Sequence, residues 1–192
     1  MTDPQDQYVV SIMSRDRVGI VYEISKSISE LSGNIAEIRQ SVLCGYFTMI
    51  LLASFPKNVN QRDIERKLAE VDAHSETAIA TVVKKVENNS HEYIKPGSEY
   101  TYVLTATGAD RIGFVATVAS FCKDHEINIL DLSTTYSGGD YIMILLIDMT
   151  RCSSIVDVRS ELKQFAQDTG LKIVLQHNDI FKAVNEINLP LH

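Results

Sequence analysis

The segment Asp16-Arg17-Val18-Gly19 returns 94 residues later as Asp110-Arg111-Ile112-Gly113. The match runs without a gap from position 14 to position 52, where 11 of the 39 aligned pairs are identical. It includes the Asn-Ile pairs at 34–35 and 128–129. Self-similarity at a fixed offset indicates a duplicated structural unit. The chain of 192 residues is therefore interpreted as two copies of one domain.

A β-rich run precedes the motif in each copy, and an amphipathic helical pattern follows it. In the first copy apolar residues recur at helical spacing from Ile20 to Leu31, and Gly33 is expected to be the C′ residue of that helix. The second copy has Ile127 in place of Gly33, so a different helix-ending turn is expected there. Two strands and a tight turn follow, and glycine supplies the positive φ that such turns require near Gly45 and Gly139.

A second helix is expected to begin at Asn60 in the first copy and at Ser154 in the second. A final strand closes each copy, at Thr77–Val86 and at Lys172–Gln176. The order βαββαβ in both copies predicts an α+β chain of two ferredoxin-like domains with antiparallel sheets. These domains are placed at residues 1–88 and 100–192, with a polar linker at 89–99 and a short helical extension at the C-terminal end.

The third strands, Met49–Ala53 and Ile142–Ile147, are apolar at consecutive positions. A sheet with one solvated face alternates apolar and polar residues, so these strands predict that both faces are covered. Helices cover one face. The other domain, the segment Asn178–Ile187 or a second subunit is expected to cover the other, which favours a homodimer or a packed pair of domains.

The composition and charge of the chain disfavour several classes of function. The net charge of −7 disfavours direct binding to nucleic acid, which requires clustered Lys and Arg, and a basic membrane patch. The three cysteines are an odd number without close spacing, which favours a reducing compartment. The polar N-terminal residues do not resemble a signal peptide, and no apolar run reaches membrane-spanning length. A soluble, cytoplasmic protein that does not bind membranes is expected.

The recurring Asp-Arg-x-Gly segment is the candidate site. Asp16 and Asp110 are expected to be helix N-caps, with Gly19 and Gly113 in the first helical turn. An exposed helix start with a bare glycine can receive a carboxylate or a phosphate. The alternative, that the aspartate only caps the helix and the glycine only permits close packing, is equally compatible with the spacing. Asn34 and Asn128 are more typical of a helix C-terminal turn than of ligand contact.

No catalytic residues are predicted. The five histidines stand far apart without metal-ligand spacing, and no phosphate-binding loop, nucleotide-binding glycine motif or nucleophile elbow occurs. Cys122 lies on an apolar helix stripe and is expected in the core, whereas Cys44 is expected at an exposed hairpin tip. No metal and no cofactor are expected, and the chain is not predicted to be an enzyme.

The Asp-Arg-x-Gly segments, the Asn-Ile pairs and the hairpins after them resemble those of the ACT domain. Two such domains in a chain of this size resemble the glycine cleavage system transcriptional repressor-like proteins. The resemblance implies a regulatory module that binds a small ligand, most often an amino acid, at interfaces between ACT domains. It also implies a regulatory protein as the partner of this chain.

The resemblance further implies which residues bind the ligand. Carried over by position, one half-site comprises Asp16, Arg17, Gly19 and Asn34, and the other comprises Asp110, Arg111, Gly113 and Asn128. Turn N–H groups would receive a carboxylate, and Asn or Asp an ammonium group. The residues before the motif differ between the copies, so the two sites are expected to be unequal. Three functions remain open: an amino-acid-sensing regulator, an interaction module that binds no ligand, and, least favoured, an enzyme.

Overall fold

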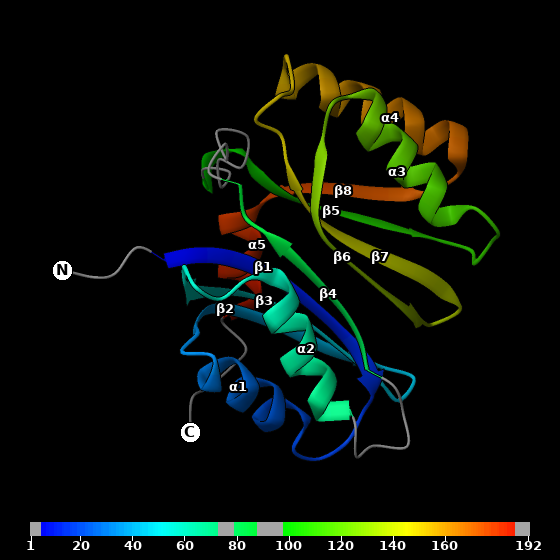
Figure 1. Ribbon diagram of the computed structural model, residues 1–192. Coiled ribbons are helices and arrows are strands. Elements are labelled where there is room, and N and C mark those ends of the chain that lie inside the picture. The colour runs from blue at the N-terminus through cyan, green and yellow to red at the C-terminus, as the bar shows by residue number, and fades with distance from the viewer. Residues whose placement is uncertain (1–4, 73–78, 88–97, 187–192) are drawn as a thin grey trace. The chain divides into compact units, whose positions relative to one another are not determined.

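The computed structural model describes residues 5–72, 79–87 and 98–186, and the chain divides into two units, Met1–Tyr93 and Ile94–His192. They are named unit 1 and unit 2 (Figure 1). The expected linker at 89–99 lies outside the described residues except for its last two positions.

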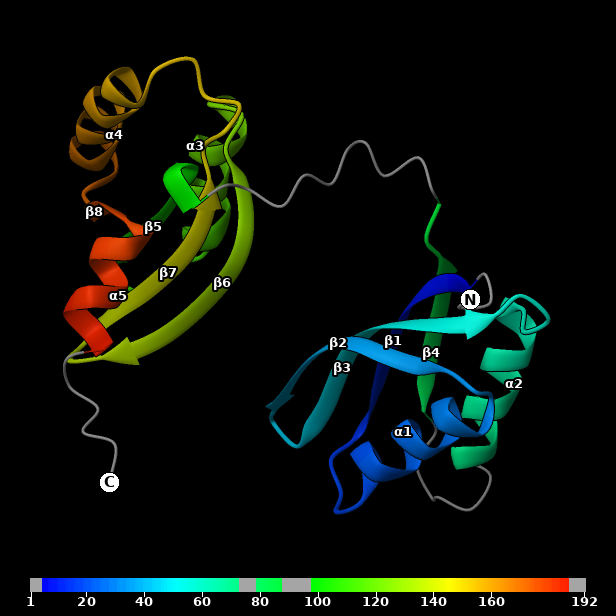
Figure 2. The same cartoon turned by 90° about the vertical axis from the view of Figure 1, so that its left-hand side faces the viewer.

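Unit 1 follows the predicted order βαββαβ. Its elements are β1 (Gln5–Arg15), α1 (Ile20–Glu30), β2 (Asn34–Leu43), β3 (Tyr46–Pro56), α2 (Gln61–Asp72) and β4 (Ala80–Lys85). The strands form an antiparallel sheet in the order β2-β3-β1-β4. Residues 77 and 78 of the expected last strand lie outside the described residues. Helices α1 and α2 pack against one face of this sheet (Figure 2).

Unit 2 repeats this arrangement and adds a helix. After a short 3₁₀ turn (Ser98–Tyr100) its elements are β5 (Thr101–Gly108), α3 (Phe114–Asp124), β6 (Asn128–Ser137), β7 (Asp140–Asp148), α4 (Ile155–Thr169), β8 (Lys172–His177) and α5 (Asn178–Glu186). The sheet order β6-β7-β5-β8 is the same as in unit 1. The α+β prediction of two ferredoxin-like units with antiparallel sheets is therefore confirmed.

Each unit has its own hydrophobic core between sheet and helices. In β3, Met49 and Leu51 face this core, each 2 % exposed, because alternate residues of a strand point to opposite faces. Ile50, which lies between them, points to the other face and is 48 % exposed. No described element of unit 1 covers Ile50, so a cover from the other unit or from a second subunit stays a prediction there.

Helix α5 of unit 2 covers a sheet face, as the sequence analysis proposed for one possible position of this segment. Helix α5 packs against β5 and β8, on the face of the sheet opposite α3 and α4 (Figure 1). Val103, which points to that face of β5, is only 4 % exposed. Ile187, the last residue of the expected helical segment, lies outside the described residues. The C-terminal segment thus covers part of its own unit's sheet.

The first helix of each copy ends in the same way, which corrects the prediction at Gly33. Ser32 is the left-handed C′ residue (φ 57°), and the Gly33 N–H donates to the Ile28 carbonyl at 3.0 Å. In the second copy Glu126 takes the left-handed conformation (φ 55°), and the Ile127 N–H donates to the Cys122 carbonyl at 2.8 Å. Both are Schellman motifs, so the different turn expected at Ile127 is wrong.

Position 33 requires a glycine because its neighbours leave no room for a side chain, and not because of its backbone conformation. A Cβ at this position would lie 2.4 Å from Cε1 of Phe55 and 2.8 Å from both Cγ2 and the carbonyl oxygen of Ile28. The second copy has Ile127 in place of this glycine and the smaller Met149 in place of Phe55, and both are buried. A small residue beside a large one in unit 1 thus corresponds to two residues of similar size in unit 2.

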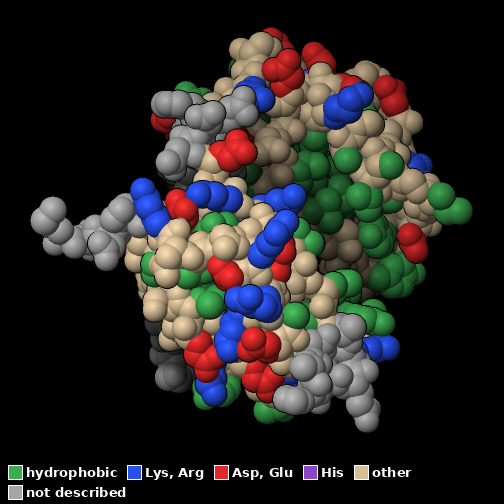
Figure 3. Space-filling view, in the orientation of Figure 1, with side chains coloured by type: hydrophobic (Ala, Val, Ile, Leu, Met, Phe, Trp, Pro, Cys, Tyr) green, Lys and Arg blue, Asp and Glu red, His purple; other side chains and the backbone are tan. Residues whose placement is uncertain are grey.

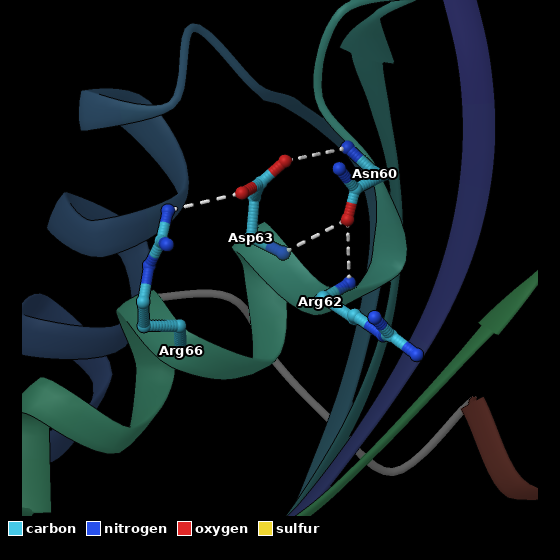
Figure 4. Close-up of polar contacts among 4 residues, drawn as sticks. All are labelled: Asn60, Arg62, Asp63 and Arg66. Carbon is cyan, nitrogen blue, oxygen red and sulfur yellow. Dashed lines mark hydrogen bonds and ion pairs between the residues drawn. The ribbon is translucent and has the colours of Figure 1, made fainter.

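The second helices begin where the sequence predicted. The Asn60 side chain accepts hydrogen bonds from the N–H groups of Arg62 (2.9 Å) and Asp63 (3.2 Å), while Asp63 accepts one from the Asn60 N–H (3.1 Å) (Figure 4). Arg66 adds an ion pair to Asp63 at 3.0 Å. In unit 2 the Ser154 hydroxyl caps α4 by accepting a hydrogen bond from the Asp157 N–H. These reciprocal bonds satisfy N–H groups that have no partner within the helix.

Replacing Asn60 with alanine removes the cap of α2 and is expected to lower the free energy of unfolding by about 1 kcal/mol. Urea denaturation monitored by circular dichroism measures the change. Asn58→Ala, two residues earlier and also exposed, is the control and is expected to change stability by less than about 0.5 kcal/mol. An equal loss in both variants would contradict the assigned cap.

Candidate ligand-binding site

The Asp-Arg-x-Gly loop of unit 1 connects β1 to α1. The helix begins at Ile20, and its N-cap is Gly19, in the left-handed conformation (φ 90°). This cap residue makes no side-chain hydrogen bond to the helix. The prediction that Asp16 is the N-cap is therefore wrong, since Asp16 lies three residues before the cap. The helix start consequently presents backbone N–H groups that no capping side chain occupies.

Backbone hydrogen bonds hold this loop in place. The Asp16 N–H donates to the Gly45 carbonyl at 3.0 Å, which ties the loop to the turn between β2 and β3. The Glu23 N–H donates to the Gly19 carbonyl at 3.0 Å and closes the first helical turn. Val18, at the tip of the loop, is fully exposed. The loop is thus a fixed projection with an apolar tip.

Arg17 lies across the helix start in a two-point ion pair with Glu23. Its Nη1 donates to Oε1 at 3.0 Å, and its Nη2 donates to Oε2 at 2.6 Å. The hydrogen bonds from Arg17 lower the pKa of the Glu23 carboxyl from its usual 4.5. The ion pair therefore holds the Arg17 guanidinium beside the first helical turn. The Glu23 carboxylate already neutralises part of its positive charge.

Replacing Arg17 with glutamine is expected to raise the pKa of Glu23 towards its ordinary value, because the charged hydrogen-bond donors are lost. A lowered carboxyl pKa in the folded state means that the pair stabilises the fold above the ordinary pKa, and that this stabilisation disappears as the pH falls through the folded-state value. Titration of the Glu23 carboxyl by NMR in both proteins measures the shift. Identical titration curves would exclude the ion pair in solution.

The corresponding loop of unit 2 has the same left-handed glycine but a different residue at the position of Glu23. Gly113 is again the left-handed N-cap of its helix (φ 86°), so the prediction of Asp110 as the cap is also wrong. Thr117 stands where unit 1 has Glu23, and its hydroxyl donates to the Gly113 carbonyl at 2.9 Å. Unit 2 therefore has a neutral side chain at the position where unit 1 has the carboxylate that pairs with Arg17.

The two asparagines lie far from these loops. Asn34 and Asn128 are exposed first residues of β2 and β6, so they open the second strand of each copy as the sequence indicated. Asn34 pairs through Ser54 with Gln7 near the start of β1, whereas the Asp16 loop follows the end of that strand. These two ends are about 25 Å apart at a rise of about 3.3 Å per residue. Within one unit the structure does not bring the asparagine together with the loop.

A cavity of about 530 Å³ lies at the Asn34 end of the unit 1 sheet. The hydroxyl of Ser54, one of its lining residues, donates to the Asn34 carbonyl at 3.4 Å. Asp6 and Lys85, joined by an ion pair of 2.6 Å, also line it. The volume suits a small molecule. Sequence reasoning did not select these two residues, because only strand pairing brings positions 6 and 85 together.

The remaining candidate chemistry does not form a reaction centre in the described part of the chain. Burial raises the pKa of the Cys122 thiol to about 11, which leaves little thiolate at neutral pH and agrees with its predicted place in the core. Cys44 is exposed at the turn after β2, as predicted. Among the described residues no group of three or more His, Cys, Asp or Glu could hold a metal ion.

Charges of both signs lie together on helix α2. Lys and Arg intermingle with Asp and Glu over α2 (Figure 3), where Lys67 pairs with Glu70 at 2.7 Å and with Glu30 at 2.9 Å. No described helix is both long and apolar enough to cross a membrane.

Comparison with protein families gives a match to both units. The model of the ACT domain matches residues 6–92 and 101–176, which is most of the chain. Among curated proteins, the UPF0237 protein MK1213 of Methanopyrus kandleri is 33 % identical over 86 residues, covering 44 % of this chain and 96 % of the relative. The UPF0237 protein CA_C0478 of Clostridium acetobutylicum is 34 % identical over 87 residues, covering 44 % and 97 %. Each relative thus has the length of a single unit.

Two solved structures share the fold over most of the chain. An unknown protein from Galdieria sulphuraria matches with a TM-score of 0.73 at 22 % identity, covering 90 % of this chain and 98 % of that one. A candidate glycine cleavage system transcriptional repressor matches with a TM-score of 0.70 at 17 % identity, covering 90 % and 96 %. At these identities the likeness concerns the fold.

Proposed function

The chain belongs to the ACT domain family, and we propose that it is an amino-acid-sensing regulatory protein. In this proposal it binds a small ligand at ACT domain interfaces and acts through a protein partner in the cytoplasm. It is a regulator and not an enzyme.

The feature that carries the proposal is the helix start that both copies retain. Gly19 and Gly113 are left-handed N-caps, and neither offers a side chain to the helix that follows. Free N–H groups and the positive end of the helix dipole favour a carboxylate at such a position. A helix that only needed a cap would gain stability from Ser, Asp or Asn there, as α4 does from Ser154.

In the proposal, the loop and the asparagine of each unit belong to two separate half-sites. Since Asp16 and Asn34 lie at opposite ends of their sheet, one amino acid cannot touch both within a unit. We infer that the loop receives the ligand carboxylate, and that an asparagine from another ACT unit binds the ammonium group. Asp110, Arg111, Gly113 and Asn128 have the same roles in the second copy. Thr117 in place of Glu23 supports unequal affinities at the two loops.

The biological setting is proposed from the likeness to the candidate glycine cleavage repressor. Transcriptional control of glycine cleavage by this chain would act through a protein partner, because the net charge of −7 disfavours contact with DNA phosphates. The alternative is an interaction module that binds no ligand. The fully exposed Val18 and Ile112, at equivalent loop tips, favour that alternative.

The test is a thermal shift of the full chain with a panel of amino acids that includes glycine and serine. A ligand at 100 times its dissociation constant is expected to stabilise the protein by about 2.7 kcal/mol. If no amino acid raises the melting temperature, the interaction module is the better description.

A pair of variants at Gly19 then tests the site. Gly19→Leu fills the space at the helix start and is expected to abolish the shift due to the unit 1 loop. Gly19→Ala has the same positive-φ strain with a small side chain, whose Cβ would come no closer than 3.7 Å to Glu23, and is expected to retain binding. Gly113→Leu and Gly113→Ala form the equivalent pair in unit 2. An unchanged response in both leucine variants would show that the ligand binds elsewhere.

A further inference from the structure

Strand β2 of unit 1 contains a β-bulge close to Asn34. Asn34 pairs with Ser54 of β3, and Glu37, three positions later, pairs with Leu52 after a shift in register. Ser54 and Leu52 lie on the face opposite the helices, because Ala53 between them is in the core. Without the bulge, a residue three positions after Asn34 would point to the other face. The bulge therefore places the Glu37 carboxylate on the same face as the asparagine, about 7 Å along the strand at a rise of about 3.3 Å per residue.

Strand β6 of unit 2 repeats both the bulge and the acid. Asn128 pairs with Asp148, which is itself a carboxylate. After the register shift Asp131 pairs with Leu146, so it shares a face with Asn128. Both Asn128 and Asp131 are exposed. Bulges re-aim side chains and are frequent beside functional sites. Each copy thus presents an asparagine and an acid together on the face of the sheet opposite its first two helices.

We propose that Glu37 and Asp131 bind the ammonium group of the ligand, each together with the asparagine of its own unit. This assignment rests on the proposed function, in which the asparagine end of an ACT unit receives that group. A neutral amide does not compensate a positive charge, whereas a carboxylate forms a charge-assisted hydrogen bond that is about twice as strong as a neutral one. The ligand class is therefore an amino acid whose ammonium group is free.

The surroundings of the two acids differ and favour unit 2. In unit 1 Nε of Arg39 lies 3.4 Å from Oε1 of Glu37 and compensates part of its charge. Unit 2 has Ser133 at the position of Arg39. Asp131 accepts a hydrogen bond from the Leu132 N–H at 2.9 Å, and within the described part of the chain no cation pairs with it. Asp131 is therefore expected to bind an ammonium group more tightly than Glu37.

Isothermal titration calorimetry of the full chain tests the assignment, with glycine, serine and the other amino acids of the panel as probes. Asp131→Asn keeps the size of the side chain and is expected to raise the dissociation constant of the site that it completes about ten-fold. Glu37→Gln is expected to raise that of the other site about three-fold, because Arg39 already weakens this acid. Glu65→Gln, which removes one acid from α2, is the control and is expected to change neither.

N-acetyl forms of the same amino acids provide a second measurement, because they keep the carboxylate and lose the positive charge. Acetylation is expected to weaken binding to the wild type more than binding to Asp131→Asn, since the neutral variant no longer favours a cation. Circular dichroism without ligand is expected to show equal melting temperatures for the wild type and both acid variants, because both acids are exposed.

The possible failures are distinguishable. If no amino acid binds the wild type, the proposed function is overturned and the assignment with it. If an amino acid binds and neither Asp131→Asn nor Glu37→Gln changes its dissociation constant, the assignment alone is overturned. An equal effect of acetylation in the wild type and in Asp131→Asn would also overturn it.

Discussion

Leu51→Ala and Leu145→Ala are each expected to lower the free energy of unfolding of their own unit by about 3.5 kcal/mol. The two leucines occupy the same position in the two copies and are 2 % and 0 % exposed. Each belongs to a different hydrophobic cluster, and these clusters share no residue. Truncation leaves a cavity among close-packed side chains, so the lost contacts are not replaced.

Hydrogen exchange followed by mass spectrometry separates the two units, because each peptide reports on its own segment. Leu51→Ala is expected to reduce protection in β1, β3 and β4 while β5, β7 and β8 keep theirs, and Leu145→Ala the reverse. Val156→Ala, at a residue that is 75 % exposed, is the surface control and is expected to leave both units unchanged. Equal loss of protection in both units from either core variant would show that they unfold as one.

Gly33→Ala is expected to lower the free energy of unfolding of unit 1 by about 3 kcal/mol. The added methyl would overlap the Phe55 ring, and it would also approach the Ile28 carbonyl, which accepts the Gly33 N–H and is fixed by that bond. Urea denaturation of the full chain, read from peptides of unit 1 by hydrogen exchange, measures the loss.

Phe55→Met is the compensating change, because unit 2 has methionine at this position beside Ile127. In the Gly33→Ala background it is expected to recover part of the loss, so that the double variant is more stable than the sum of the single effects predicts. Strictly additive effects would mean that the alanine is accommodated without pressing on the ring.

Much of the fold could be predicted from local signals. The repeat around Asp16-Arg17-Val18-Gly19 gave two domains, and apolar periodicity gave the order of helices and strands. Asn60 and Ser154 were recognisable as caps, because Asn and Ser bond to the N–H groups two or three residues later in the chain. Such signals depend on a few neighbouring residues, which the sequence displays directly.

The predictions of helix ends were wrong where several neighbouring residues could each take the same structural role. Asp16 is a favourable cap by type, but the left-handed Gly19 starts the helix three residues later. Gly33 is favourable as a C′ residue by type, but Ser32 takes that conformation and the glycine instead makes room for Phe55, which lies 22 positions away. Which residue of a turn has positive φ depends on packing at a distance, which residue type alone does not show.

The candidate ligand site shows more clearly that residue type alone does not tell which residues are close in space. The resemblance assigned Asp16 and Asn34 to one half-site by their positions in the sequence. That assignment assumed that the two residues are close in space. Helix α1 carries the chain back from the loop, so β2 begins with Asn34 at the end of the sheet opposite the loop. The predicted topology already implied this separation, since a ten-residue strand is about 30 Å long.

The separation of loop and asparagine also fixes the stoichiometry of the proposed ligand. Every ACT unit has one loop and one asparagine, at opposite ends, and each complete site of the proposal uses one of each. However the units associate, the number of complete sites cannot exceed the number of units. A saturating calorimetric titration should therefore end at no more than two ligands per chain, and at one where a single loop binds.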